Sequence, residues 1–145
     1  MGKIKALCIS PSRGRKDSVN EVNIIENFGI EGDWHSKKDS DRQISFLSTA
    51  AIKEVVEKGI SIKDGDFGEN IILDDINIRD IKIGDVIKLG EFVEIEVRKI
   101  GKDCVEPCII YKTVGMCVMP ECGVFGNVIK GGRIKVGDSC SYSKR

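Results

Sequence analysis

The chain has 145 residues, of which 41% are hydrophobic and 32% are charged, so it is long enough for one folded core and too short for two. Its 23 basic and 23 acidic side chains balance, so no net field favours nucleic acid or an anionic membrane surface. We therefore expect a single domain spanning residues 1–145 that binds no nucleic acid.

The sequence pattern predicts neither a membrane-spanning segment nor a signal peptide. No apolar run approaches the ~20 residues that span a bilayer, and Lys3 and Lys5 interrupt the start too early for a signal-peptide core. We expect a cytoplasmic protein without membrane contact, in which the six cysteines stay reduced. The single histidine, His35, excludes any mechanism that needs two imidazoles.

The first half of the chain alternates between strand-like segments and one helix. Alternation predicts an opening strand over Ile4–Ile9, a second extended segment over Val19–Ile30 and a short strand over Gln43–Leu47. A helix follows, because apolar side chains recur at helical spacing through Glu57 and Ser48 or Thr49 can cap its start.

The second half is dominated by β patterns separated by glycine turns. Strand-like segments occur at Asn70–Leu73, Ile76–Ile83, Val86–Leu89, Glu91–Val97 and Ile134–Val136, with a last strand after Gly137-Asp138. Short strands with frequent turns and one helix favour a mostly β fold. We expect a closed or nearly closed β-barrel with one main helix and a few short ones.

Four cysteines, at positions 104, 108, 117 and 122, form the densest chemical cluster of the sequence. Their spacing, C-x3-C-x8-C-x4-C, lacks the pairs two residues apart that typify zinc knuckles, although a metal site or a redox disulfide stays open. Cysteine is also a common small core residue, and this is the favoured interpretation for Cys8 and Cys140 inside strand patterns and for Cys117. Pro107 restricts Glu106 to extended backbone and presents Cys108 on a rigid loop, which suits a reactive thiol.

Two further segments carry polar groups that could serve a site. In Gly32-Asp33-Trp34-His35, the imidazole of His35 could be a general base or ligand, or a structural histidine held by Asp33. Trp34 fits a pocket wall and a core position equally well. In Gly65–Asn70, Glu69 offers a carboxylate and Asn70 an amide beside an apolar strand, and the segment lacks the pattern of a phosphate loop.

Taken in order, these segments resemble the MOSC domain, the module named after the C-terminal domain of molybdenum cofactor sulfurase. The matching motifs are Gly32-Asp33-Trp34-His35, Arg42 to Leu47, Gly65 to Asn70, Ile83-Gly84-Asp85, Pro107-Cys108, and Gly123-Val124-Phe125-Gly126 through Gly137-Asp138. More narrowly, the chain is similar to short stand-alone bacterial MOSC proteins. It departs from that subgroup at Val105, where the pattern has a histidine.

The resemblance implies a β-barrel of the MOSC or PK-barrel kind and a pocket built from these motifs. It implies that Cys108 is the functional thiol, carrying sulfur or ligating molybdenum. It also implies that Asp33, His35, Arg42, Glu69 and Asn70 line a site for the molybdenum cofactor, molybdopterin. Pyridoxal phosphate is not expected, because the chain has no room for a lyase domain.

Three functions are compatible with these implications. The first is an accessory protein of molybdenum cofactor metabolism that binds the cofactor, or transfers sulfur to it from a donor protein through Cys108. The second is a cofactor-dependent reductase of N-hydroxylated compounds that takes electrons from a donor in trans. The third is a non-catalytic binding module whose cysteines pack or hold zinc.

Overall fold

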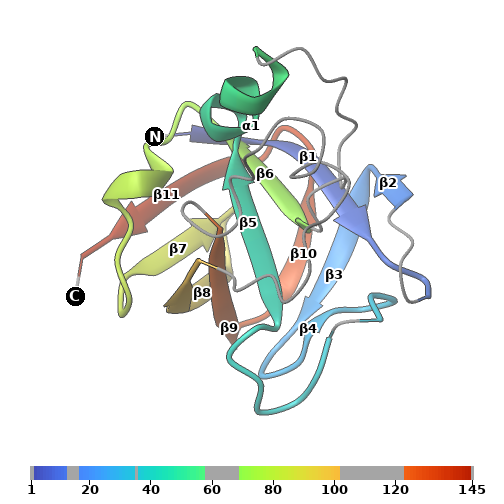
Figure 1. Cartoon of the computed structure of the whole chain (residues 1–145). Coiled ribbons are helices and arrows are strands. Elements are labelled where there is room, and N and C mark those ends of the chain that lie inside the picture. Colours follow the sequence, from blue (N-terminus) through green and yellow to red (C-terminus); the bar gives the residue numbers. More distant parts are fainter. Residues whose placement is uncertain (1, 13–16, 35, 58–68, 102–122, 145) are drawn as a thin grey trace.

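The computed structural model describes residues 2–12, 17–34, 36–57, 69–101 and 123–144 (Figure 1). Its strands are β1 (Gly2–Ile9), β2 (Asp17–Val19), β3 (Glu21–Ile25), β4 (Gly29–Ile30), β5 (Ile44–Ser48), β6 (Ile71–Asp74), β7 (Val86–Leu89), β8 (Val93–Ile100), β9 (Val124–Lys130), β10 (Gly132–Lys135) and β11 (Ser139–Ser143). The helices of the described residues are α1 (Thr49–Val56) and the 3-10 turn η1 (Ile78–Asp80).

The main sheet closes on itself. Its strand order is β11-β7-β8-β9-β5-β6-β1, and β11 pairs back onto β1 through Gly2 with Cys140 and Lys3 with Ser139. These strands form a closed seven-stranded barrel, which confirms the predicted fold class. β2 extends the sheet beyond β1, and β3 lies between β10 and β4 in a separate small sheet.

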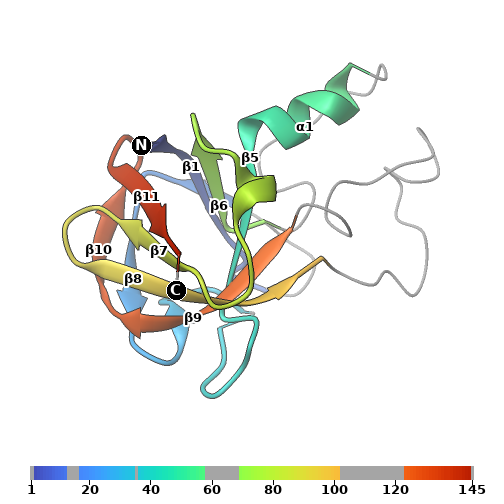
Figure 2. The ribbon, with the colours of Figure 1, turned by 90° about the vertical axis from the view of Figure 1, so that its left-hand side faces the viewer.

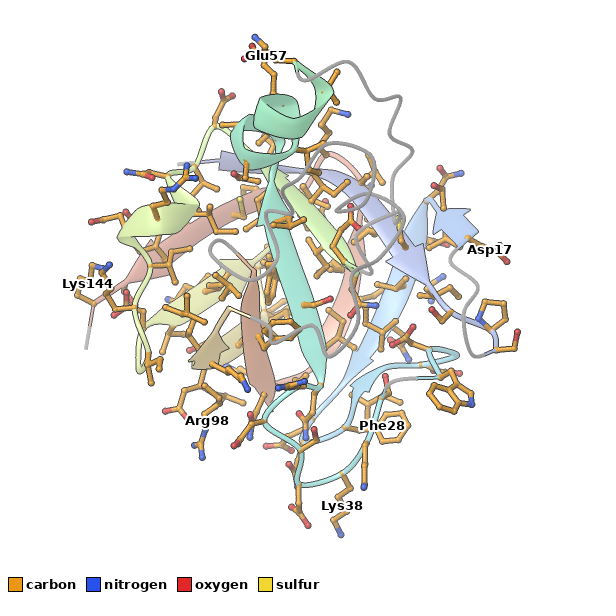
Figure 3. The ribbon with its side chains drawn as sticks, viewed as in Figure 1. Asp17, Phe28, Lys38, Glu57, Arg98 and Lys144 are labelled. Carbon is orange, nitrogen blue, oxygen red and sulfur yellow. The ribbon has the colours of Figure 1, made fainter. Side chains whose placement is uncertain are left out.

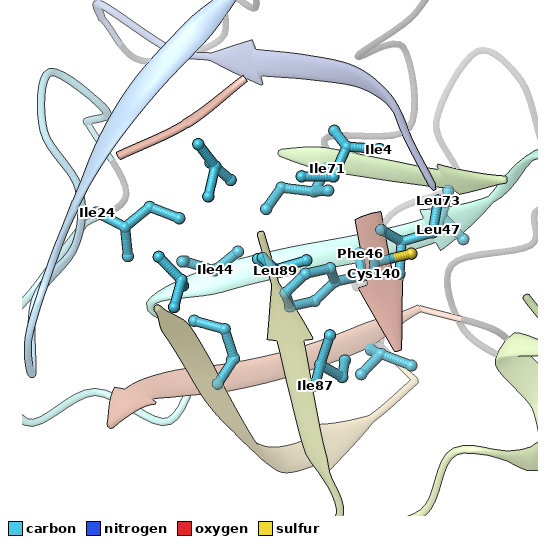
Figure 4. Packing of buried hydrophobic residues seen from close by; sticks show 14 of the residues in the cluster. Ile4, Ile24, Ile44, Phe46, Leu47, Ile71, Leu73, Ile87, Leu89 and Cys140 are labelled. Atoms are coloured by element: carbon cyan, nitrogen blue, oxygen red, sulfur yellow. The ribbon is translucent and has the colours of Figure 1, made fainter. Parts of the chain in front are cut away.

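The barrel interior is filled by side chains that alternate along each strand. Ile44 and Phe46 of β5 are fully buried, as are Ile71 and Leu73 of β6 and Ile87 and Leu89 of β7 (Figure 4). Burying one such side chain contributes about 1.5–3 kcal/mol, so this apolar layer is the main stabilising element of the fold. Because the interior is a packed apolar core, we look for a functional site on the outer face of the barrel and in its loops.

The predicted helix is present and begins where its cap was expected. The Oγ of Ser48 accepts a hydrogen bond of 3.1 Å from the backbone N–H of Ala51, which satisfies one of the unpaired donors of the first turn. The helix follows β5 directly and lies at the end of that strand, outside the barrel (Figure 2).

The segment Ile76–Ile83 was expected to be a strand, and this expectation was wrong. It contains the 3-10 turn η1, and Asp75 before it has a left-handed φ of 56°. Ile78 and Ile81 are buried and stand three residues apart, which is the repeat of a 3-10 turn. Their spacing therefore overrides the local alternation of apolar and polar residues.

Two other expectations need refinement. The extended stretch over residues 19–30 is interrupted at Asn20, between β2 and β3, and again between β3 and β4, because the chain turns at Asn27, where φ is 49°. The strand β9 was not predicted at all, although it pairs with both β8 and β5 at the centre of the barrel wall. Gly126 in its middle resembles a turn signal in the sequence, but an added Cβ there would lie 2.4 Å from the carbonyl oxygen of Glu96. Close strand packing explains this glycine.

Candidate functional site

Five residues align across neighbouring strands on the outer face of the barrel. Lys99 of β8 pairs with Phe125 of β9, and Phe125 pairs with Ser45 of β5. Asn70 stands beside Ser45, and Cys8 of β1 donates its N–H to the carbonyl oxygen of Asn70 at 2.7 Å. The chain neighbours of Cys8, Ser45, Asn70 and Phe125 include core residues that fill the barrel interior, so these four side chains point outward, and Lys99 lies on the face of its register partner Phe125. We call Lys99, Phe125, Ser45, Asn70 and Cys8 the outer row.

Four of the five outer-row residues are buried, although the row lies on the outside of the barrel, and Lys99 is half-buried. The exposed fraction is 0% for Cys8, 3% for Asn70, 5% for Ser45 and 6% for Phe125. Because buried polar groups are costly without partners, the hydroxyl of Ser45 and the amide of Asn70 need hydrogen bonds within the protein.

Asn70 provides these hydrogen bonds and ties three strands together. Its Oδ1 accepts bonds of 3.1 Å from both the N–H and the Oγ–H of Ser45, and its Nδ2 donates to the carbonyl oxygen of Cys8 at 3.2 Å. Its own N–H lies 3.0 Å from the Oγ of Ser45. The predicted site residue Asn70 therefore braces β5 against β1 at the start of β6.

Glu69 precedes Asn70 and is fully buried. Acidic side chains are rarely buried without a partner, and Glu69 interacts with another group of the protein. The structure thus places this predicted site residue directly beside the outer row, at the same end of β6.

Asp33 is anchored to the same end of β1 as Asn70. Its Oδ1 accepts a hydrogen bond of 2.7 Å from the N–H of Ser10, and the N–H of Trp34 donates to the carbonyl oxygen of Ser10 at 2.6 Å. Ser10 is two residues beyond Cys8, so the turn that carries Asp33 and the brace at Asn70 meet on one short stretch of strand. Trp34 is 54% exposed, which shows that its interpretation as a core aromatic was wrong.

Arg42 reaches the outer row from the start of β5. Its guanidinium carbon lies 5.6 Å from the centre of the Phe125 ring, within the range of a cation–π contact. Arg42 is exposed, and none of the ion pairs within the described part of the chain involves it. Of the predicted site residues that the structure describes, Arg42 is the one with a charged group facing solvent.

Gln43 is a buried polar residue whose role the sequence did not reveal. Its Oε1 accepts a bond of 2.9 Å from the N–H of Val128, and its Nε2 donates to the Oδ1 of Asn27 and to the carbonyl oxygen of Lys37. It joins β9 to the turn after β3 and so holds the base of the segment that carries Arg42. A single glutamine in a strand pattern gives no local signal for such partners.

Cys108 and His35 lie outside the described residues, as do Cys104, Cys117 and Cys122. The two residues that flank the segment containing Cys108 lie side by side: the N–H of Gly101 donates a hydrogen bond of 2.7 Å to the carbonyl oxygen of Gly123. Within residues 2–12, 17–34, 36–57, 69–101 and 123–144, no group of three histidine, cysteine or acidic side chains could hold a metal ion.

The two described cysteines pack in the fold, as expected. The thiols of Cys8 and Cys140 are buried, with 0% and 2% exposure. Burial raises the pKa of the Cys140 thiol to about 11, so this group stays protonated and unreactive at neutral pH.

Comparison with known proteins identifies the class. The family model of the MOSC domain matches residues 31–141, so the chain belongs to the MOSC domain family, which is associated with molybdenum cofactor sulfurase-like proteins. No curated protein matches the chain. No helix within the described ranges is long and apolar enough to cross a bilayer.

Solved structures share the fold at low sequence identity. The YuaD protein from Bacillus subtilis superposes with a TM-score of 0.82 at 18% identity, covering 99% of this chain and 97% of that one. YiiM from Escherichia coli gives a TM-score of 0.67 at 18% identity, covering 99% of this chain and 70% of its own. YiiM from Geobacillus stearothermophilus gives 0.65 at 18% identity, with 100% and 76% coverage. These likenesses establish the fold alone.

Proposed function

We propose that this protein is an accessory factor of molybdenum cofactor metabolism, which binds molybdopterin or passes sulfur to it through Cys108. One observation carries the proposal: two motifs far apart in sequence meet at one end of β1 in a chain of the MOSC family, the first contributing Asp33 and the second Glu69 and Asn70.

The chemistry of the described residues fits such a ligand. Molybdopterin is polar and anionic, and Arg42 supplies a solvent-facing cation beside the outer row. The amide of Asn70 is engaged within the protein, so we assign it the role of holding the site together. The described thiols, Cys8 and Cys140, are both buried, so the soft sulfur donor falls to the four cysteines outside the described residues, of which we assign Cys108 because of the Pro107-Cys108 motif.

Each part of the chain then has a separate task. Asp33 and Asn70 position the turn and the strand start, and Arg42 neutralises the anionic end of the ligand. The bound cofactor would supply a soft metal–dithiolene centre for which a cysteine thiolate is a suitable partner. Cys108 would accept sulfur by attacking the outer sulfur of a donor persulfide. The donor's S–S bond breaks, its thiolate leaves, and Cys108 carries the persulfide.

Replacement of Cys108 by serine tests the proposal. Wild-type protein is expected to bind purified molybdopterin and to accept sulfur from a low-molecular-weight persulfide, and Cys108→Ser is expected to lose sulfur loading completely. Cys140→Ser is the matched control, since the buried thiol should not contribute. Unchanged molybdopterin affinity together with unchanged sulfur loading in Cys108→Ser would contradict the proposal.

A further inference from the structure

We propose that Arg42 and Lys99, which both lie beside the Phe125 ring, form a phosphate-binding subsite. The inference deepens the proposed function, because it assigns one chemical group of the ligand, a phosphate monoester, to two residues of this chain. Lys99 is not part of any motif considered above.

Arg42 is held ready for an anion by its contact with Phe125. The guanidinium carbon stands 5.6 Å from the ring centre, and the ring itself is only 6% exposed. A guanidinium lying over an aromatic face keeps its N–H donors free at the edge, where a tetrahedral oxyanion can accept two of them. The backbone of Arg42 is also held in place, because its N–H donates a hydrogen bond of 3.1 Å to the Oγ of Ser40.

Lys99 lies beside Phe125 on the neighbouring strand β8. It is the register partner of Phe125 on β8, next to a β-bulge between Val97 and Lys99, and register partners of antiparallel strands have side chains on the same face. Its side chain is half-buried. Within the described residues no ion pair involves Lys99, so its ammonium group is not already neutralised.

The acidic groups closest in sequence are neutralised by another cation. Arg98 pairs with Asp41 through its Nε at 3.3 Å and with Glu96 through its Nη1 at 2.9 Å. Asp41 directly precedes Arg42 in sequence, and Glu96 precedes Lys99 on β8. Arg98 therefore neutralises both carboxylates, and it lies at the periphery of the molecule (Figure 3). Arg42 and Lys99 remain as two uncompensated positive charges about one aromatic ring.

Two positive charges, one of them a planar donor fork, select a compact dianion over a carboxylate. The phosphate of molybdopterin has this chemistry, and so does free inorganic phosphate or pyrophosphate. The position beside Ser45 and Asn70 puts such a phosphate next to the proposed cofactor site.

The test is calorimetric titration of the full chain with pyrophosphate, and separately with molybdopterin and its dephosphorylated form. The double variant Arg42→Ala with Lys99→Ala is compared with a matched double variant, Arg133→Ala with Lys88→Ala. The matched variant removes the same charges elsewhere, since Arg133 is paired with Glu21 on β3 and Lys88 lies on β7. Circular dichroism verifies that all variants fold.

The inference predicts that the Arg42–Lys99 double variant binds pyrophosphate and molybdopterin at least tenfold more weakly, while the matched variant changes by less than twofold. The affinity of Arg42→Lys should lie between those of the wild type and the Arg42–Lys99 double variant, because lysine keeps the positive charge and loses the paired N–H donors of the guanidinium.

Equal affinity of both double variants for pyrophosphate would overturn the subsite. If wild type binds pyrophosphate at Arg42 and Lys99 but ignores molybdopterin, the subsite stands and the proposed function fails. If dephosphorylated molybdopterin binds as tightly as molybdopterin, the subsite is wrong and the proposed function survives.

Discussion

Asn70 joins three strands through hydrogen bonds of its side chain and its backbone. The partners are Ser45 on β5 and Cys8 on β1, which stand 25 and 62 residues away in the chain. The sequence indicated a polar residue of a site at this position, beside Glu69. It could not indicate the brace, because no local pattern links an asparagine to partners so far away in sequence.

Replacing Asn70 tests the brace at the level of one residue. In Asn70→Leu, the Ser45 hydroxyl and N–H and the Cys8 carbonyl lose buried partners, so we expect the free energy of unfolding to fall by about 2–4 kcal/mol. Asn23→Leu is the control, because Asn23 is an exposed asparagine bonded to Glu31 and should change stability by less than about 1 kcal/mol. Equal losses in urea titrations would rule out a special role for Asn70.

The buried thiol of Cys140 makes stability depend on pH in the alkaline range. Its folded pKa is raised from the ordinary value of 9.0 to about 11, chiefly by burial. The unfolded chain loses this proton first, so the folded state is favoured below pH 9 and the advantage is lost as pH rises toward 11.

Comparison with Cys140→Ala isolates this effect. The pKa of Tyr142 is raised by its hydrogen bond to Asp80, and that of Lys144 is raised by its bond to Asp85. Tyr142 and Lys144 are present in both proteins, so their contributions cancel when the unfolding free energies of wild type and Cys140→Ala are subtracted. We expect the unfolding free energy of wild type to fall more steeply than that of Cys140→Ala between pH 9 and 11. Parallel curves would show that the thiol is accessible to solvent.

At the scale of elements, the sequence predicted the strands that alternate cleanly and missed those shaped by packing. Val86–Leu89 is a strand as expected, and the strand predicted over Glu91–Val97 is part of β8, whose buried face carries Val93, Ile95 and Val97. The strand β9 was missed because Gly126 interrupts its pattern. The fit of that glycine against Glu96 depends on a strand nearly thirty residues earlier, which local alternation cannot reveal.

Gly126→Ala tests this packing. The added methyl group would meet the Glu96 carbonyl oxygen at 2.4 Å and a methyl of Ile95 at 2.8 Å, so β8 and β9 have to move apart. We expect a loss of about 1–3 kcal/mol in unfolding free energy and a lower melting temperature. Lys130→Ala, at the exposed end of the same strand, serves as the reference and should have little effect. An unchanged melting temperature for Gly126→Ala would show that the two strands are not so closely packed.

At the scale of the whole molecule, the barrel brings together motifs that the sequence spreads over most of the chain. The fold class could be predicted because short alternating strands and glycine turns favour closure, and the family follows from the order of the motifs. The geometry of the site could not be predicted, because it depends on the register of β1, β5, β6, β8 and β9. Asp33 and Asn70 meet at β1, whereas Arg42 approaches from the other side through Phe125.

The central claim is that Cys108 carries the sulfur or cofactor chemistry of this barrel. Native mass spectrometry of the intact chain, incubated with molybdopterin and a persulfide donor, measures the bound molybdopterin and the added sulfur in one spectrum. We predict one molybdopterin and one added sulfur atom on wild type and on Cys104→Ser, and no added sulfur on Cys108→Ser. Full sulfur and cofactor loading of Cys108→Ser, or zinc bound in place of both on wild type, would contradict the account.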